Sequence, residues 1–157
     1  MIQQGQALPV ATLSELTADG MVNHDVTELF ANKKVVLFAV PGAFTPTCSE
    51  AHLPGYVVLA DELKAKGVDL IACVSVNDAF VMQAWGAAQN ASEILMLGDG
   101  DASFTKALGL EMDTGGFGGI RSQRYAMIIE NGTVTKLNVE EPKEFEASKA
   151  ETILAAL

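Results

Sequence analysis

The sequence has few residues of the kinds that build disulfide scaffolds and zinc sites. Its 157 residues include two cysteines, Cys48 and Cys73, and two histidines, His24 and His52. Two cysteines form one disulfide at most, so a disulfide-stabilised scaffold is excluded. A zinc site of the usual Cys/His type would need all four residues, and their spacings match no zinc-finger pattern. We therefore expect no metal site, and expect a functional cysteine to be catalytic or redox-active.

The sequence is also poor in positive charge. It has 10 Lys and Arg against 20 Asp and Glu, a net charge of −10. Such a chain lacks the basic surface of a nucleic-acid binder. It has no run of about 18 apolar residues, as a transmembrane helix would require, and its N-terminus lacks the basic and apolar regions of a signal peptide. We therefore expect a cytoplasmic protein that binds neither nucleic acid nor membranes.

No repeat, linker or low-complexity block interrupts the chain, which predicts a single domain over residues 1–157. Short apolar runs rich in β-branched residues predict buried strands, and Asn131-Gly132 is the turn signal of a β-hairpin. The predicted strands are 34–40, 69–76, 125–130 and 133–139, with a further apolar run near 94–97. Helical patterns occupy 46–66, 78–89, 103–108 and 148–157.

Helix-end signals accompany three of these helices. Pro54 lies inside the first, where it should kink the helix or remove a backbone bond. Asn77 is the expected N-cap of the second. Ser148, with Glu151 three residues later, forms a capping-box pattern for the last. The alternation of strands and helices, followed by a hairpin and a helix, predicts an α/β thioredoxin-like fold with a central mixed sheet flanked by helices.

Cys48 lies at the predicted start of a helix. Thr45 occupies the N-cap position and Pro46 the first helical position, where its missing N–H costs nothing. Thr47 and Cys48 then fall in the first turn, where backbone N–H groups lack partners and the helix dipole is positive. Both features stabilise a thiolate, and the free N–H groups could also bind peroxide oxygens. The alternative is that Cys48 is only a small buried apolar residue.

A thiolate at Cys48 needs a cation nearby, because Glu50 opposes it. Arg121 and Arg124 are the only arginines in the chain. Arg124 directly precedes the predicted strand 125–130, which should hold its backbone well. A guanidinium with several donors suits both a thiolate and a polarised peroxide. The alternative is a solvated charge at a strand end.

Residues 41–48, Pro-Gly-Ala-Phe-Thr-Pro-Thr-Cys, resemble the peroxiredoxin active-site motif Pro-x-x-x-Thr-x-x-Cys. The likeness is greatest to the peroxiredoxin 5 and plant type II subfamily and covers nearly the whole chain. The matching segments are Thr47-Cys48-Ser49, His52-Leu53-Pro54-Gly55, 75–81, Trp85-Gly86, Asp99, Phe104, Leu108-Gly109-Leu110, 121–125 and Asn138-Val139-Glu140.

This resemblance implies a thiol-dependent peroxidase that reduces hydrogen peroxide and alkyl hydroperoxides through a sulfenic acid at Cys48. Pro41 would shield that intermediate, and the Thr45 hydroxyl would bond to the thiolate and the substrate. Arg124 would stabilise the thiolate and the leaving oxygen. The backbone N–H groups of Thr47 and Cys48 would complete the substrate site, to which Gly42 would also belong. No cofactor is implied, because sulfur carries the two electrons.

The role of the second cysteine is open. Cys73 lies inside the apolar run 69–76, where it is either a core residue or a secondary thiol. Plant-type relatives carry a cysteine at this place, whereas animal-type relatives also have a resolving cysteine near the C-terminus. This sequence has Phe-Glu-Ala-Ser-Lys there, at 145–149. The resemblance therefore favours a one-cysteine cycle that uses glutathione and glutaredoxin, or thioredoxin, as reductant. It also implies a homodimer paired through the active-site face.

Three other functions compete with a peroxidase. A redox sensor or holdase would use Cys48 oxidation as a signal, and an inactive thioredoxin-like module would use no thiol chemistry. A cysteine hydrolase would need a His–acid pair near Cys48, and none is evident. His52, one turn after Cys48, could tune the thiol, although a packing or interface role is favoured. Residues 115–119 are rich in glycine and are expected to form a flexible loop.

Overall fold

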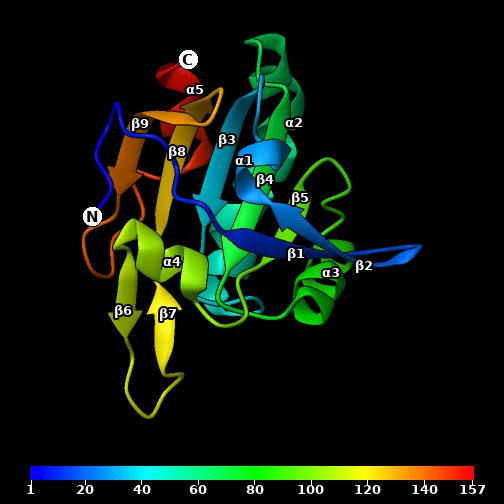
Figure 1. Cartoon of the computed structure of the whole chain (residues 1–157), viewed down its shortest axis with the longest axis vertical. Coiled ribbons are helices and arrows are strands. Elements are labelled where there is room, and N and C mark those ends of the chain that lie inside the picture. Colours follow the sequence, from blue (N-terminus) through cyan, green and yellow to red (C-terminus); the bar gives the residue numbers. More distant parts are fainter.

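The computed structural model describes all 157 residues as a seven-stranded sheet with helices on both faces (Figure 1). The strand order is β2-β1-β5-β4-β3-β8-β9, and β6 and β7 form a separate hairpin. The strands are β1 (Thr12–Thr17), β2 (Gly20–Asp25), β3 (Lys34–Ala39), β4 (Leu70–Ser75), β5 (Leu95–Gly98), β6 (Glu111–Asp113), β7 (Ile120–Ser122), β8 (Tyr125–Glu130) and β9 (Thr133–Val139). The helices are α1 (Val26–Leu29), α2 (Leu53–Ala65), α3 (Ala79–Ala88), α4 (Ser103–Leu108) and α5 (Ala150–Ala155), with a π-helical turn at Cys48–His52.

The centre of the sheet is mixed, as predicted. β3, β4 and β5 are parallel, and β8 pairs antiparallel with β3. β8 and β9 form the hairpin expected at Asn131-Gly132, where both residues have positive φ, 47° and 79°. Turns of this kind match the right-handed twist of the flanking strands. The prediction of an α/β protein with a central mixed sheet flanked by helices is confirmed.

The central strands β3, β4 and β8 are buried on both faces, and successive residues of each strand point to opposite sides. On β3, Val36 and Phe38 join a core cluster with α2, α3 and α5. Val35 and Leu37 join a second cluster with α1 and α4 on the other face. These central strands are apolar on both faces, which explains why their sequences are continuous apolar runs rather than alternating patterns.

Two predicted helix caps are wrong. The cap of α3 is Asp78, whose Oδ1 accepts a hydrogen bond from the Val81 N–H at 2.8 Å. Asn77 is not available, because its side chain accepts instead from the Ala43 N–H at 3.0 Å. At the last helix, Lys149 occupies the N-cap position without a side-chain bond, and Ser148 donates its hydroxyl to Glu140 at 2.7 Å. Both predicted cap residues therefore form hydrogen bonds with distant segments instead of capping their helices.

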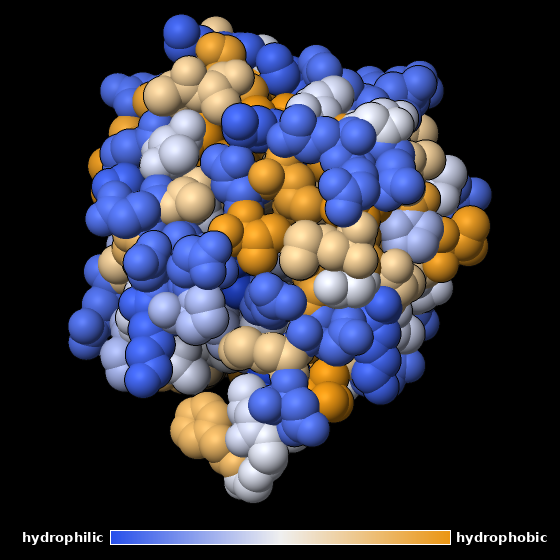
Figure 2. All heavy atoms as spheres, turned by 90° about the vertical axis from the view of Figure 1, so that its left-hand side faces the viewer, coloured by the Kyte–Doolittle hydropathy of each residue, from blue (hydrophilic) through white to orange (hydrophobic).

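Two hairpins were not predicted. β1 and β2 pair along residues 12–25, where exposed and partly buried residues leave no strong pattern. β6 and β7 flank residues 115–119, so this glycine-rich segment is the tip of a hairpin that projects from the body (Figures 1 and 2). None of the helices combines the length and the apolar character needed to cross a bilayer.

Candidate active site

Cys48 lies in the first turn of the helical segment that follows β3. The chain becomes helical at Pro46, and the first helical hydrogen bond runs from the Ser49 N–H to the Thr45 carbonyl at 2.9 Å. Thr45 therefore occupies the N-cap position, as predicted. The N–H groups of Thr47 and Cys48 have no acceptor within the chain, and the Cys48 side chain is buried. The cysteine thus sits among unpaired donors.

The turn after Cys48 is a π-turn rather than an α-turn. Leu53 donates its N–H to the Cys48 carbonyl, five residues back. Pro54 follows, has no N–H, and its ring would clash with the carbonyl of Glu50 in a regular α-helix. The wider turn relieves that clash. The π-turn is therefore the effect of Pro54 on this helix. Single π-helical turns of this kind are frequent at functional sites.

The strand register brings Arg124 to the sulfur. Tyr125 pairs with Ala39 at the end of β3, so Arg124 lies beside the point where the chain leaves β3 for Cys48. Its Nη2 donates to Cys48 Sγ at 3.1 Å. Neither arginine of the chain forms an ion pair with a carboxylate. The guanidinium charge of Arg124 therefore faces the sulfur without a competing anion.

His52 is the second partner of Arg124. Its Nδ1 accepts from Arg124 Nη1 at 2.9 Å, and its Nε2–H donates to the Ser148 carbonyl at 3.2 Å. A guanidinium only donates and a carbonyl only accepts, so these contacts select the neutral Nε2–H tautomer. Burial, and then the charge of Arg124, lower the pKa of His52 to about 3. His52 is therefore a neutral acceptor that orients the guanidinium.

The loop from Pro41 to Thr45 leads from β3 to the helix start and is held by hydrogen bonds between side chains and the backbone. The Thr45 hydroxyl donates to the Gly42 carbonyl at 2.7 Å and so does not donate to Cys48 in this structure, unlike the arrangement expected from sequence. Arg121 Nη1 donates to the Val76 carbonyl at 3.3 Å and lies 3.5 Å from the Pro41 carbonyl. A Cβ at Gly42 would lie 3.2 Å from the Thr45 side chain, so little space is left there.

A cavity of about 330 Å³ opens beside this loop. Its lining includes Pro41, Thr47 and Arg124, together with Met112, Gln123 and residues 140–145. Three of the predicted site residues therefore share one cavity next to the buried sulfur. Figure 2 shows the side of the molecule that bears β9, where hydrophilic atoms dominate around a smaller apolar area.

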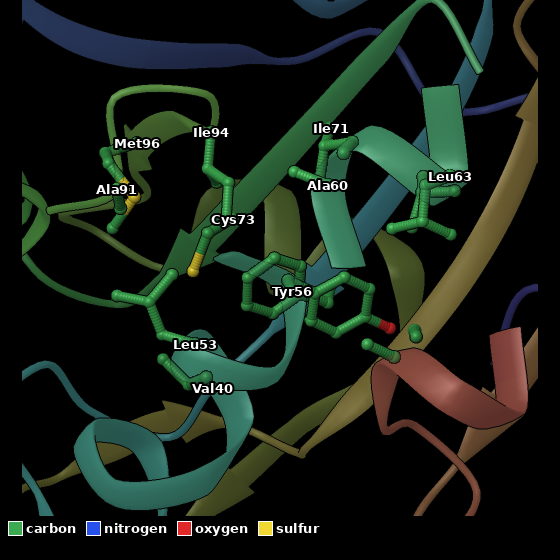
Figure 3. Close-up of a cluster of buried hydrophobic side chains, with 14 of the residues drawn as sticks. Val40, Leu53, Tyr56, Ala60, Leu63, Ile71, Cys73, Ala91, Ile94 and Met96 are labelled. Carbon is green, nitrogen blue, oxygen red and sulfur yellow. The ribbon is translucent and has the colours of Figure 1, made fainter. Parts of the chain in front are cut away.

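Cys73 lies on β4 in the same core cluster as Cys48, and both thiols are free. Its side chain is directed toward Leu53 of α2 within apolar neighbours (Figure 3). Burial, followed by the nearby Cys48, raises the pKa of the Cys73 thiol well above its ordinary value. A thiol in this setting is poorly ionised and therefore a weak nucleophile.

Several supporting residues were not assigned from the sequence. Asn77, expected only as a helix cap, accepts from the Ala43 N–H. Arg121, expected only as a candidate cation for Cys48, instead lies near the carbonyls of Pro41 in the loop and Val76 after β4. Glu140 and Ser148 belong to the C-terminal segment that reaches His52. Of the supporting residues, only His52 could be placed near Cys48 from the sequence, because residues i and i+4 share a helix face. The other contacts join segments far apart in the chain.

Comparison with known proteins identifies the family. A model of the Redoxin family matches residues 3–154. The rice (Oryza sativa subsp. japonica) protein "Peroxiredoxin-2E-2, chloroplastic" is 53% identical, over 99% of this chain and 72% of the rice protein. Peroxiredoxin-2D of Arabidopsis thaliana is 48% identical, over 99% of this chain and 98% of its own length. The crystal structure of reduced Prx3 from Vibrio vulnificus in complex with H2O2 matches with a TM-score of 0.99 at 83% identity, over 99% of both chains.

These similarities extend over almost the whole chain and include the helix start, the sheet and the closing helix. The thioredoxin-like fold expected from the order of strands and helices is thereby confirmed. The chain belongs to the type II and peroxiredoxin 5 subfamily of the peroxiredoxins, and it is a thiol-dependent peroxidase.

Proposed function

We propose that Cys48 is the thiol that reduces the peroxide. Its thiolate attacks the terminal oxygen of the hydroperoxide, so that an S–O bond forms while the O–O bond breaks. Sulfur loses two electrons and becomes a sulfenic acid, and the leaving oxygen takes a proton to give water or an alcohol. The observation that carries this proposal is the 3.1 Å contact between Arg124 Nη2 and Cys48 Sγ, with no carboxylate on the guanidinium.

The surrounding groups suit the charge that moves during this step. Arg124 would stabilise the thiolate first and the leaving oxygen next. The unpaired N–H groups of Thr47 and Cys48 would bind the peroxide oxygens. The Thr45 hydroxyl, which donates to Gly42, would accept the peroxide O–H. Pro41, on the cavity wall, would limit access of further peroxide to the sulfenic acid.

The reductant is proposed to be an external thiol. The Cys73 thiol lies in a strand within the core, so a disulfide with Cys48 would require local unfolding. Glutathione would instead attack the sulfenic sulfur, giving a mixed disulfide and water. A thiol of glutaredoxin would then attack the glutathione sulfur of this mixed disulfide. This step releases the Cys48 thiol and forms a disulfide between glutaredoxin and glutathione. Thioredoxin is the alternative donor.

Two variants and one mass measurement test this cycle. Cys48→Ser should abolish peroxide turnover, and Cys73→Ala should keep most of it with glutathione and glutaredoxin. Peroxide-treated protein without added thiol should carry oxygen on Cys48. A Cys48–Cys73 disulfide in that sample would refute the one-cysteine cycle. Consumption of only one equivalent of peroxide in the presence of donor would point to a redox sensor.

We also propose that the protein forms a homodimer through the face that bears the active site. Phe44, in the active-site loop, is 57% exposed, and Phe80, on α3, is 61% exposed. Exposed aromatic side chains of this size are typical of interfaces. Trp85, by contrast, is fully buried and donates its indole N–H to the Ser49 hydroxyl, so it is a core residue. Sedimentation of Phe80→Ala should show a weaker dimer than the parent protein.

A further inference from the structure

Glu140, directly after β9, has its carboxylate bound entirely by one short segment. Its Oε2 accepts from the N–H groups of Glu146 and Ser148, each at 2.8 Å, and from the Ser148 hydroxyl at 2.7 Å. Its Oε1 accepts from the Ala147 N–H at 3.1 Å. Burial alone would raise the pKa of Glu140, but these four bonds outweigh burial and lower it. The group is an ionised carboxylate without a cationic partner.

The bound segment presents one carbonyl to the active site. The Ser148 carbonyl accepts from the Tyr56 hydroxyl at 2.7 Å and from His52 Nε2–H at 3.2 Å. The Tyr56 ring is itself stacked on Phe38 at 4.0 Å, so its hydroxyl is well fixed. The N–H of Ser148 is held by Glu140 and its carbonyl is held by α2. The direction of this carbonyl is therefore determined from both sides.

His52 connects that carbonyl to the reacting sulfur. Its Nε2–H bond to Ser148 leaves Nδ1 as an acceptor, and Nδ1 takes the Nη1 donor of Arg124 at 2.9 Å. The adjacent Nη2 of the same guanidinium reaches Cys48 Sγ at 3.1 Å. A planar guanidinium with one nitrogen held in place has its other donors oriented as well. A shift of the Ser148 carbonyl would thus move His52 and, through it, change the contact between Arg124 Nη2 and Cys48 Sγ.

We propose that Glu140 is a positioning residue for the peroxidase reaction, which acts through Ser148 and His52 to hold Arg124 against Cys48. The inference rests on the roles proposed above for Cys48 and Arg124. Glu140 touches neither the sulfur nor the substrate. Its effect is to keep residues 146–148 in the one arrangement that makes His52 a donor at Nε2 and an acceptor at Nδ1.

The principal test is the rate of Cys48 oxidation by hydrogen peroxide in a single turnover, measured for the full chain. Glu140→Ala removes all four acceptor bonds and should slow oxidation by roughly 10- to 100-fold, the scale of small misplacements of a catalytic group. Glu140→Gln can keep its amide oxygen at the position that accepts three bonds, and should lose less. Glu130→Gln, the same change at the last residue of β8, should match the parent protein. An unchanged rate in Glu140→Ala would overturn the proposal.

A double-mutant cycle with His52 separates positioning from a general loss of structure. If Glu140 acts through His52, then Glu140→Ala should have little further effect in a His52→Ala background. Multiplication of the two effects would overturn the proposal, because Glu140 would then act by another route. If Glu140→Ala does not fold, the same cycle is run with Glu140→Gln. Full activity of Cys48→Ser would reject the proposed function itself, a result that is distinct from either outcome.

Discussion

Arg124 and Glu140 are joined by a backbone hydrogen bond just beyond the end of the β8–β9 ladder, yet their side chains form no ion pair. The Glu140 N–H donates to the Arg124 carbonyl at 2.9 Å. The Glu140 carboxylate turns to residues 146–148, and the Arg124 guanidinium turns to His52 and Cys48. A direct pair between them would neutralise the cation that the thiolate requires. In a chain of net charge −10, keeping this arginine clear of carboxylates is a specific feature of the site.

Replacing Arg124 by lysine should therefore impair catalysis although the charge is kept. A lysine ammonium is a point charge and lacks the planar fork that reaches His52 and Cys48 together. Arg124→Ala should reduce the rate constant for peroxide by roughly 100- to 1,000-fold, and Arg124→Lys should recover only part of the loss. Rapid mixing with hydrogen peroxide measures both. A lysine variant as fast as the parent protein would show that charge alone suffices.

Asn77 should contribute to activity through the loop rather than through α3. Its Oδ1 accepts from the Ala43 N–H at 3.0 Å and lies 2.8 Å from the Ser75 hydroxyl. Asn77→Ala should cost about 1 kcal/mol of unfolding free energy and slow peroxide reduction, because the loop bond is lost. Asn77→Asp keeps the acceptor and should retain both. Urea unfolding and peroxide kinetics of the two variants test this. If Asn77→Ala is as stable and as fast as Asn77→Asp, the bond to Ala43 does not contribute to activity.

Cys73 should matter for stability and not for turnover. The side chain is fully buried among apolar neighbours. Cys73→Ala leaves a small cavity and should cost about 1 kcal/mol. Cys73→Ser places a hydroxyl in the same apolar cluster and should cost about 1–3 kcal/mol if that hydroxyl has no partner. Alanine is therefore the cleaner test of the cycle. Loss of steady-state turnover in a folded Cys73→Ala protein would show that Cys73 takes part in regeneration.

The main elements and the reacting pair were predictable because their signals are local. The β8 strand and the turn at Asn131-Gly132 are marked by short patterns, and Cys48 is marked by the residues of its helix start. Chemistry limits the cation to two candidates, Arg121 and Arg124, because a thiolate needs a cation and these are the only arginines. The resemblance to the peroxiredoxin motif then selects Arg124. These inferences needed no knowledge of how distant segments pack.

The supporting contacts were not predictable because they join distant segments. His52 and Ser148 are 96 residues apart. The irregular segment between β9 and α5, which carries Ser148, has no periodicity that fixes its path. Asn77 and Asp78 are both good N-cap residues, and only the position of Ala43 decides which of them caps α3. Capping rules describe isolated helices, whereas here the tertiary structure supplies a competing partner.

The buried neutral His52 should make the protein lose stability as the pH falls. Its pKa is about 3 when folded and 6.5 in the reference state, so the unfolded chain binds more protons between these values. The free energy of unfolding should then decrease on acidification below pH 6.5, by up to about 1.4 kcal/mol per pH unit. Glu140 acts in the same direction at lower pH. Its lowered pKa gives stability that is present above the ordinary carboxyl pKa and lost as the pH falls through the folded value.

Urea unfolding over a series of pH values measures this dependence, and His52→Asn isolates the histidine. The variant should be less stable near neutrality, because Arg124 and Ser148 lose a partner. Between pH 6.5 and pH 4.5 its free energy of unfolding should change less than that of the parent protein. The interval ends at pH 4.5 because carboxyl groups titrate below that value. His24→Asn removes the other histidine, which is paired with Glu15 at the surface, and should keep the steep fall. If His52→Asn and the parent protein show the same slope in this interval, the pH dependence has another source, and His52 is not held neutral by burial and Arg124.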